Sequence, residues 1–456
     1  MKEKIRKGFE VITDRRTIAS LFIFYLLYVK NIFINILNNP SARVLYQKLG
    51  WVLAFFVAFD MLAELFSRKL ILSKQQIPIW IFFCWAFICT FFNPNEFVQE
   101  SVRQLAIFLM ECYLLITMKK RIGQKKTDKY LAFIGYQVII VFLVVNLINL
   151  YLFVHYKIGG SELSGIFASE NLFVYDNGLH GEQFKGIYEW MTDGSYRCLL
   201  SLLVGFILAD KKKLPWWAAG INATVCAVML FLEGCRSSLI GLCVAFVYLI
   251  WYIVKKVLFH FSGFKPKYRK VQIFMGILLL GVLILAFVGF RKLSTLQAAD
   301  QAAFYDTIQA VSTGRWRIWQ AAIKLANESP IFGWGWGSFP QEGLKFLYSD
   351  IMTVDYHNIF INVLVFTGYP GLVLFLVLLF TFYFLIIKNM KYITVQKNCW
   401  MFILCICFLI SSCLNTGVLG QDSHIEDPFF WICLGCLIYP KPSRKNESQD
   451  KTAIGN

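Results

Sequence analysis

Long apolar segments recur along most of the chain, and they restrict its possible folds more than any other feature. Residues 130–154, for example, contain no charged side chain. An α-helix rises 1.5 Å per residue and the hydrocarbon core of a bilayer is about 30 Å thick, so about 20 such residues cross it once. Only 16% of the 456 residues are charged and 57% are apolar, whereas soluble domains have about 25% charged residues. The chain is therefore predicted to be an all-α integral membrane protein.

Twelve segments of this kind are predicted to be transmembrane helices. The tenth contains Gly368-Tyr-Pro-Gly371, which is expected to interrupt the helix. The predicted spans are residues 17–37, 45–66, 77–93, 101–118, 130–154, 194–210, 215–232, 237–254, 271–290, 362–387, 399–414 and 428–440.

The basic residues are distributed unequally between the loops that join these spans. The chain holds 45 Lys and Arg against 28 Asp and Glu, which gives a formal net charge of +17. Alternate loops, such as 119–129 and 255–270, are rich in Lys and Arg, whereas segment 155–193 is mainly acidic. Cytoplasmic loops of membrane proteins carry an excess of Lys and Arg, so both termini are predicted to be cytoplasmic. The positive charge is then a topology signal, and a nucleic-acid partner is not expected.

Two predicted external segments, 155–193 and 291–361, are too long to be simple turns and are candidates for function. The second is predicted to contain amphipathic helices over 297–311 and 315–327, between spans nine and ten, and Pro330 is expected to end the latter helix. The predicted organisation is an N-terminal transmembrane bundle (1–214), a central region that carries the chemistry (215–387), a C-terminal transmembrane pair (388–440) and a cytoplasmic tail (441–456).

The thirteen cysteines lie in predicted spans or, for Cys235, at the end of one. Buried cysteine usually acts as a small apolar residue, so no disulfide framework is expected. The pair Cys433 and Cys436 has the spacing of a metal site but lacks a second pair. No Asp-x-Asp sequence occurs, and we therefore expect neither a metal ion nor another cofactor.

Polar residues that can carry chemistry occur at two places in the central region. Arg236 follows a span and a Glu-Gly-Cys sequence, so a tight external corner holds it close to the bilayer surface. An arginine at such a position either anchors the helix at the interface or holds an anion. The second external segment adds Arg315 and Arg317, the bend around Gly333, and His357, where the chain returns to the membrane. The glycine series lacks the lysine of a phosphate loop and is interpreted as a tight bend.

This ordered set of motifs resembles the O-antigen ligase and polymerase superfamily. The residues that carry the resemblance are Arg236, Arg315 with Trp319, Pro330 with Gly333 and Gly335, His357 with Asn358, and Gly368 with Gly371, and they cover roughly residues 215–380. The family corner is often Ser-Arg-Gly, whereas this chain has Cys-Arg-Ser. The resemblance implies a glycosyltransferase of the bacterial cytoplasmic membrane. Its donor would be an undecaprenyl-diphosphate-linked glycan, and its acceptor hydroxyl would lie outside the membrane.

Inverting transfer of this kind needs fixed cations for the departing diphosphate and a base for the acceptor hydroxyl. Our hypothesis assigns Arg236 and Arg315 to the diphosphate, Arg317 to a second contact with it, and His357 to the base. The other candidate substrate-binding residues are Asn358, Trp319, Gly333 and Gly335. A carboxylate base remains an alternative, with Glu233, Glu342 and Asp355 as the candidates.

The acceptor distinguishes the possible functions. A polymerase transfers the glycan to another lipid-linked repeat, whereas a ligase transfers it to a terminal lipid or wall anchor; we favour the polymerase. The alternative of another class is a flippase or transporter of lipid-linked oligosaccharides, for which Asp60, Glu64 and Glu111 are candidate intramembrane acids. A transporter often has two related halves, and no such similarity is visible in the sequence.

Overall fold

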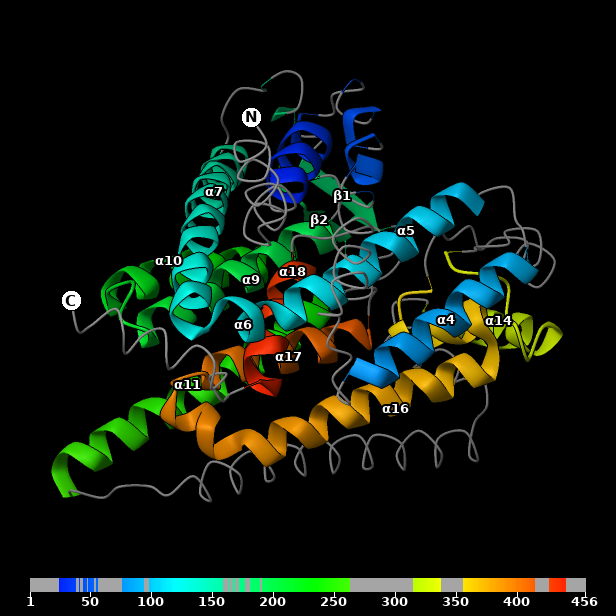
Figure 1. Cartoon of the computed structure of the whole chain (residues 1–456). Helices are drawn as coiled ribbons and strands as arrows, with labels where there is room; N and C mark the ends of the chain where they lie inside the picture. Colours follow the sequence, from blue (N-terminus) through cyan, green and yellow to red (C-terminus); the bar gives the residue numbers. More distant parts are fainter. Residues whose placement is uncertain are drawn as a thin grey trace, which may run out of the picture.

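The computed structural model describes residues 24–37, parts of 41–55, 76–93, 98–158, 163, 167–168, 172–176, 181–188, 191–262, 315–337, 356–414 and 426–439. Helices of very different lengths pack against one another, and a small β-hairpin lies beside them (Figure 1). In chain order the elements are η1 (Phe24–Ile36), α4 (Ile77–Phe92), α5 (Val98–Met110), η3 (Glu111–Leu115), α6 (Ile116–Ile122), α7 (Gln124–Ile158), β1 (Phe173–Asp176), β2 (Gly181–Phe184), α9 (Met191–Asp210), α10 (Trp216–Glu233), α11 (Arg236–Ser262), α14 (Arg315–Glu328), α16 (Ile359–Val395), α17 (Cys399–Ser412) and α18 (Glu426–Ile438).

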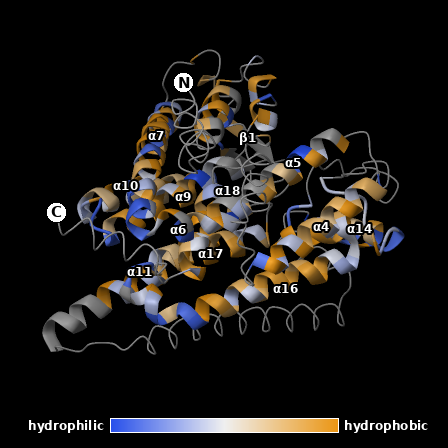
Figure 2. Cartoon of the chain, in the orientation of Figure 1, coloured by the Kyte–Doolittle hydropathy of each residue, from blue (hydrophilic) through white to orange (hydrophobic). Residues whose placement is uncertain are grey.

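Four of the described helices are long and apolar enough to cross a bilayer. They lie within Gln124–Ile158, Trp216–Glu233, Arg236–Val254 and Ile359–Thr394, and shorter apolar helices cover Ile77–Phe92, Cys399–Ser412 and Asp427–Ile438. The long helices expose large apolar side chains, such as Ile140 of α7 and Phe380 of α16. In Figure 2 the ribbons of both helices are orange, and so hydrophobic, over much of their length. Exposed apolar surface of this extent suits a lipid environment. The protein is thus a helical membrane protein, as predicted.

The count of twelve spans stays a prediction. The predicted span 271–290 lies outside the described residues, and most of span 45–66 does as well. The candidate amphipathic helix 297–311 also lies outside them, whereas the helix predicted over 315–327 is α14. This helix buries Ala321, Ala322 and Leu325, and it packs on α16.

Segment 155–193 contains a short β-hairpin that the sequence did not predict, within a fold that is otherwise helical as expected. β1 and β2 pair antiparallel, with Phe173 opposite Phe184. The two rings lie 5.2 Å apart, and the ring of Phe184 also lies 5.2 Å from that of Phe153 on α7. Cross-strand aromatic pairs stabilise a hairpin, and the contact with α7 lets this short one bury an apolar face.

α16 is interrupted at Gly368, as the Gly-Tyr-Pro-Gly sequence predicts. Gly368 has φ 68° and ψ −175°, a conformation that is essentially restricted to glycine. The bend after α14 lies directly against this interruption, because Tyr369 N–H donates to the carbonyl oxygen of Pro330 at 2.8 Å. A Cβ atom on Gly368 would overlap the backbone of Ile331. The break in α16 therefore receives the bend that follows α14.

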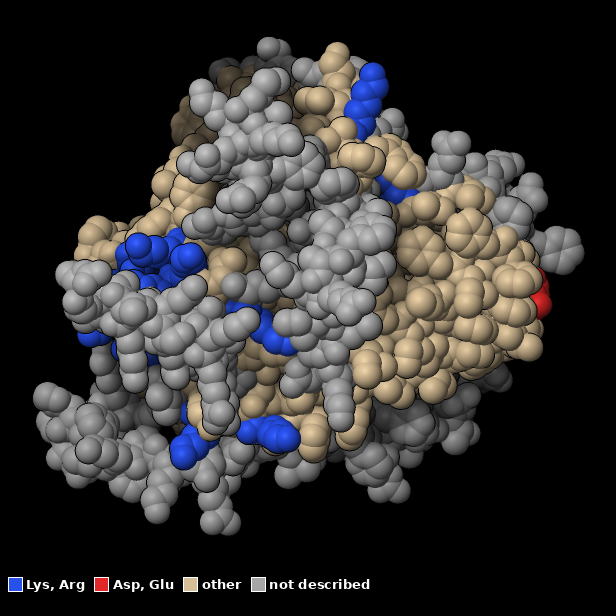
Figure 3. Space-filling model, viewed as in Figure 1, with Lys and Arg blue, Asp and Glu red and all other residues tan. Residues whose placement is uncertain are grey.

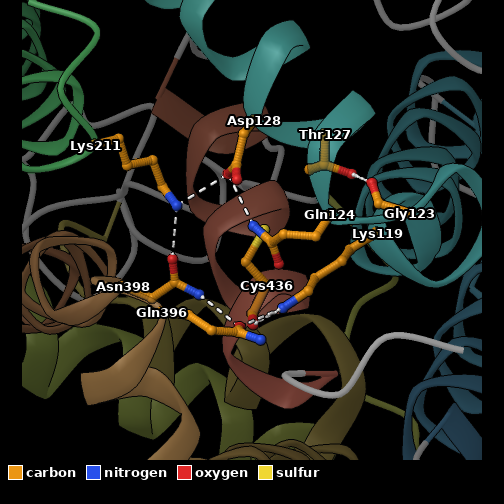
Figure 4. A network of polar contacts seen from close by, with 9 residues as sticks. All are labelled: Lys119, Gly123, Gln124, Thr127, Asp128, Lys211, Gln396, Asn398 and Cys436. Atoms are coloured by element: carbon orange, nitrogen blue, oxygen red, sulfur yellow. Dashed lines mark hydrogen bonds and ion pairs between the residues drawn. The ribbon is translucent and has the colours of Figure 1, made fainter. Parts of the chain in front are cut away.

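A polar network joins the α6–α7, α9–α10 and α16–α17 connections to α18 at one end of the bundle (Figure 4). The Nζ of Lys211 lies 2.9 Å from Asp128 Oδ1 and also 2.9 Å from Asn398 Oδ1. Lys119 Nζ donates to Gln396 Oε1 at 3.0 Å and to the carbonyl oxygen of Cys436 at 3.2 Å. Burial lowers the pKa of Lys119 from its ordinary value. The four segments are thereby fixed to one another at this end.

The same end collects many of the described basic residues, and we call it the basic end. Figure 3 shows Lys and Arg side chains grouped at the left and along the lower edge of the face drawn. The residues on the helix ends and loops that meet here are Lys119, Lys120, Arg121, Lys125, Lys126, Lys129, Lys211, Lys212, Lys213, Lys388, Lys391 and Lys397.

Candidate functional site

The last turn of α17 lies at the other end of the bundle, where several distant segments meet. Ser411 Oγ donates to the carbonyl oxygen of Ser237, in the first turn of α11, at 3.0 Å. The Ser411 carbonyl oxygen accepts a hydrogen bond from the Tyr196 hydroxyl of α9 at 3.1 Å. The final carbonyl groups of any helix lack partners within the helix and form the negative end of its dipole. This end of α17 is thus a natural docking point for donors.

Arg236 is the first residue of α11, next to the docked Ser237, and its side chain is exposed. Only Gly234 and Cys235 separate it from the end of α10. Gly234 has φ 67°, the left-handed conformation that commonly ends helices, and its N–H donates to the Leu230 carbonyl at 3.2 Å. The tight corner predicted from the sequence is confirmed, and it presents the guanidinium at the surface of the bundle.

Arg315 begins α14 and reaches the same end of α17, where its Nη1 donates to the carbonyl oxygen of Leu414. Its side chain is half-buried. A cation at the C-terminal end of a helix is stabilised by the helix dipole. Arg317 is exposed, and residues two apart on a helix do not share a face. The fold therefore brings Arg315 to the end of α17 and points Arg317 in a different direction.

His357 lies between two anchored residues just before α16. Trp319 Nε1 of α14 donates to the carbonyl oxygen of Tyr356 at 2.9 Å. On the other side, Asn358 Oδ1 caps α16 by accepting from the N–H groups of Phe360 at 2.9 Å and of Ile361 at 3.2 Å. Asn358 Nδ2 donates to the Cys413 carbonyl at 2.8 Å. Trp319 and Asn358 therefore fix the backbone on both sides of the imidazole.

Three segments that are far apart in sequence thus converge on residues 411–414, at the C-terminal end of α17. The α11 corner contacts Ser411, Asn358 contacts Cys413, and Arg315 contacts Leu414. The predicted catalytic residues Arg236, Arg315 and His357 are consequently each on, or next to, a residue bonded to this turn. We call this region the α17 end site.

Gly333 and Gly335 lie beside the break in α16 and away from the hydrogen bonds of the α17 end site. Both glycines are buried and have positive φ, at 63° and 87°. The N–H of Gly335 donates to the Phe366 carbonyl at 3.0 Å, and a Cβ atom on Gly333 would lie 2.6 Å from the Thr367 nitrogen. The structure therefore gives these glycines a packing role, since only glycine permits this approach of two backbones.

The sequence analysis did not identify two buried polar residues of α9, Ser195 and Arg197, that lie beneath the Arg236 corner. Glu233, the last residue of α10, is 1% exposed, and its Oε2 accepts from the Ser195 hydroxyl at 2.7 Å. Arg197 is equally buried, and its guanidinium carbon lies 5.2 Å from the centroid of the Tyr188 ring. Burial raises the pKa of the Tyr188 hydroxyl well above its ordinary value. The signal available in the sequence was an arginine and an acid at the same end of neighbouring apolar helices.

The candidate carboxylate bases are placed differently. Glu342 and Asp355 lie outside the described residues. Glu233 is enclosed beneath the corner, where it accepts the Ser195 hydrogen bond instead of facing the surface.

The cysteines are all free thiols. Within the described parts of the chain, no group of three or more His, Cys, Asp or Glu side chains could hold a metal ion. Metal independence stays a prediction, because acids of the second external segment lie outside those parts.

The fold and the site define a helical membrane protein with two guanidinium groups and an imidazole at one end of its bundle. Residues 221–376 match the family model described as O-antigen ligase. This match supports the O-antigen ligase and polymerase superfamily for the central region of the chain, as its motifs indicated. No curated protein matches the chain. The matched segment runs from α10 into α16, so α9 and α17 lie outside it.

Proposed function

We propose that this protein is a membrane glycosyltransferase that moves a glycan from undecaprenyl diphosphate to an acceptor hydroxyl. The observation that carries the proposal is that Arg315, the residue after Arg236 and the residue after His357 all bond to residues 411–414, at the C-terminal end of α17. The match to the O-antigen ligase family supports the same class of reaction. A flippase has no need of such an arrangement at one end of the bundle.

The proposed reaction is a single displacement. The acceptor oxygen forms a bond to the anomeric carbon of the donor while the bond from that carbon to the diphosphate oxygen breaks, which inverts the configuration. His357 takes the acceptor proton, a role that a neutral imidazole performs near pH 7. Arg236 and Arg315 hold the diphosphate, because guanidinium is always charged and pairs with phosphate oxygens in a bidentate manner.

The remaining predicted residues have supporting roles in this proposal. Trp319 and Asn358 orient His357 through the backbone bonds that flank it. Arg317 makes a second contact with the donor from the exposed face of α14. Gly333 and Gly335 contribute through the bend that they permit. The two arginines supply the charge that a metal ion supplies in other phosphate-handling enzymes, so the reaction is proposed to be metal-independent.

The proposed active site faces the extracytoplasmic side of the bacterial cytoplasmic membrane. The support is the arrangement of the helix ends: the basic end, with residues such as Lys120 and Lys213, is opposite the α17 end site. α9 and α17 connect the two ends, since each has one terminus in the basic-end network and the other near the corner. Basic loops are retained in the cytoplasm.

We propose polymerisation of lipid-linked repeats as the activity, because the long external segments provide room for a growing glycan. The test is reconstitution of the purified protein into liposomes with a lipid-linked repeat unit, followed by electrophoresis of the products. A ladder is the result expected for a polymerase. A single shifted band, seen only when a terminal anchor is supplied, would indicate a ligase. Uptake of the donor without covalent change would contradict the proposal and indicate a transporter.

A further inference from the structure

The second turn of α9 lies beneath the corner that carries Arg236. Ser195 and Tyr196 are consecutive residues of this turn, and both are buried. Ser195 bonds to the residue that ends α10, and Tyr196 bonds to residues on the other side of the corner. One turn of α9 therefore contacts the chain before and after Arg236.

The contact before the corner is a buried hydrogen bond to a carboxylate. Ser195 Oγ donates to Glu233 Oε2 at 2.7 Å, and Ser195 is fully buried. The approach is close, because a Cβ atom on the preceding Gly194 would lie 2.5 Å from Glu233 Oε1. A hydrogen bond to a charged acceptor is stronger than a neutral one and limits the movement of both groups.

The contact after the corner joins three helices. The Tyr196 hydroxyl lies 3.4 Å from Ser237 Oγ and 3.1 Å from the Ser411 carbonyl oxygen. Ser237 also contacts its neighbour in the corner, since its Oγ lies 3.2 Å from Cys235 Sγ. The position of the first turn of α11 is thus set by α9 as well as by α17.

We propose that Ser195, Tyr196 and Glu233 are positioning residues that hold Arg236 against the diphosphate of the donor. The inference rests on the function proposed above, and it adds residues of α9, which lies outside the O-antigen ligase match. Arg236 itself is exposed, while the residues on both sides of it are bonded to buried groups. A misplacement of about 1 Å in such a group can cost about 100-fold in rate.

Ser195→Ala tests the proposal against Ser201→Ala as a matched control. Ser201 is also a fully buried serine of α9, and it donates to Asn222 Oδ1 of α10 at 3.1 Å, away from the corner. Both variants delete one buried hydrogen bond between the same two helices. If Ser195 only stabilises the fold, the two variants should behave alike.

The first measurement is steady-state transfer in liposomes with varied donor and acceptor. We expect Ser195→Ala to lower kcat for the donor by about 10- to 100-fold, with the acceptor KM unchanged, and Ser201→Ala to retain the parent values. The loss should fall on kcat because the charge on the diphosphate is greatest in the transition state. Parent kinetics in Ser195→Ala, or equal losses in the two variants, would overturn the proposal.

The second measurement does not need transfer activity. Cys235 lies next to Arg236, so its rate of reaction with a membrane-impermeant maleimide reports on the corner, with Cys235→Ser as the blank. Labelling should be faster in Ser195→Ala than in the parent and unchanged in Ser201→Ala. If the parent makes no product but the labelling shifts as expected, the proposed function fails and the positioning of the corner stands. Unchanged labelling in Ser195→Ala would overturn the positioning.

Glu233→Gln serves as the second variant if Ser195→Ala does not fold. The amide oxygen can still accept the Ser195 hydrogen bond, so the shape is kept and only the charge is removed. We expect a smaller loss of kcat than in Glu233→Ala, with membrane abundance near that of the parent. Cys235 should be labelled faster in Glu233→Ala than in Glu233→Gln, because the alanine variant disturbs the corner more. Parent kinetics in both variants would overturn the role of Glu233.

Discussion

His357 has a backbone conformation that most residues avoid. Its φ is 50°, in the left-handed region. Residues other than glycine persist there only when the surrounding structure imposes the conformation, and such residues concentrate at functional sites. The Trp319 bond to Tyr356 and the Asn358 bond to Cys413 impose it here. The backbone position that carries the imidazole is therefore set by the fold.

Replacement of His357 by alanine should abolish transfer while membrane abundance stays near normal. Loss of a general base typically costs about 10²- to 10⁴-fold in rate, and product formation in reconstituted liposomes measures it. Arg236→Ala and Arg315→Ala should have the same effect. The control is His155→Ala, because His155 is a half-buried histidine near the end of α7 whose ring packs on Tyr151. Full activity in His357→Ala would remove His357 as the base.

At the scale of elements, the bend after α14 and the break in α16 form one unit. The N–H groups of Trp334 and Gly335 donate to the Val365 and Phe366 carbonyls, at 2.8 and 3.0 Å. These carbonyls are available because the helix stops at Gly368. Trp334 Nε1 donates back to the Leu325 carbonyl of α14 at 2.8 Å. The unit therefore sets the orientation of α14 relative to α16. It thereby also sets the position of Arg315, the first residue of α14.

Gly368→Ala should unfold this unit. Its φ and ψ are essentially restricted to glycine, and the added Cβ would overlap the Ile331 backbone. We expect a loss of about 2 kcal/mol or more in stability, measured by thermal unfolding in detergent. Gly220→Ala is the control, because nothing lies within 4 Å of a Cβ atom at that helical position. This variant should be neutral or slightly stabilising. Equal melting temperatures for the two variants would contradict the packing described here.

Local signals allowed part of this arrangement to be predicted. Gly368 and Pro370 predict a break in an apolar helix, and Pro330 predicts the end of α14. Both predictions are possible because glycine and proline act on the local backbone conformation. The sequence contains no comparable signal that the bend packs into the break, because that contact depends on two backbones more than 30 residues apart. Ser195 and Arg197 were missed for a similar reason. Near the start of an apolar helix they resemble interface residues, and they are buried by the packing of neighbouring helices, α10 foremost, against α9.

At the scale of the whole molecule, the two ends of the helix bundle differ in their chemistry. The basic end is tied together by Lys119 and Lys211, whereas the opposite end carries Arg236, Arg315 and His357. The chain order alone predicted this alternation, because each span reverses the direction of the chain. The hairpin of β1 and β2 was not predicted, since its four-residue strands are too short to give a periodic pattern.

Reporter fusions should place the two ends on opposite sides of the membrane. A green fluorescent protein fused after Lys213 should be fluorescent, and alkaline phosphatase fused there should be inactive, because basic loops stay in the cytoplasm. Alkaline phosphatase fused after Glu328, at the end of α14, should be active. Exchanging the two reporters at each position gives the control. The same reporter working at both positions would contradict the proposed orientation.

The docking of three segments at the C-terminal end of α17 has a consequence for the evolution of this family. α17 contributes no candidate catalytic side chain, yet Ser411, Cys413 and Leu414 receive the α11 corner, Asn358 and Arg315 through one side chain and two main-chain oxygens. Main-chain oxygens are present whatever the residue, so positions 413 and 414 are free to vary, whereas the Ser411 hydroxyl and the location of the turn are not. A chimaera that exchanges residues 221–376 between relatives would inherit every motif of the family. It would work only if the C-terminal end of the recipient's own α17 lies where the α11 corner, Asn358 and Arg315 can bond to it.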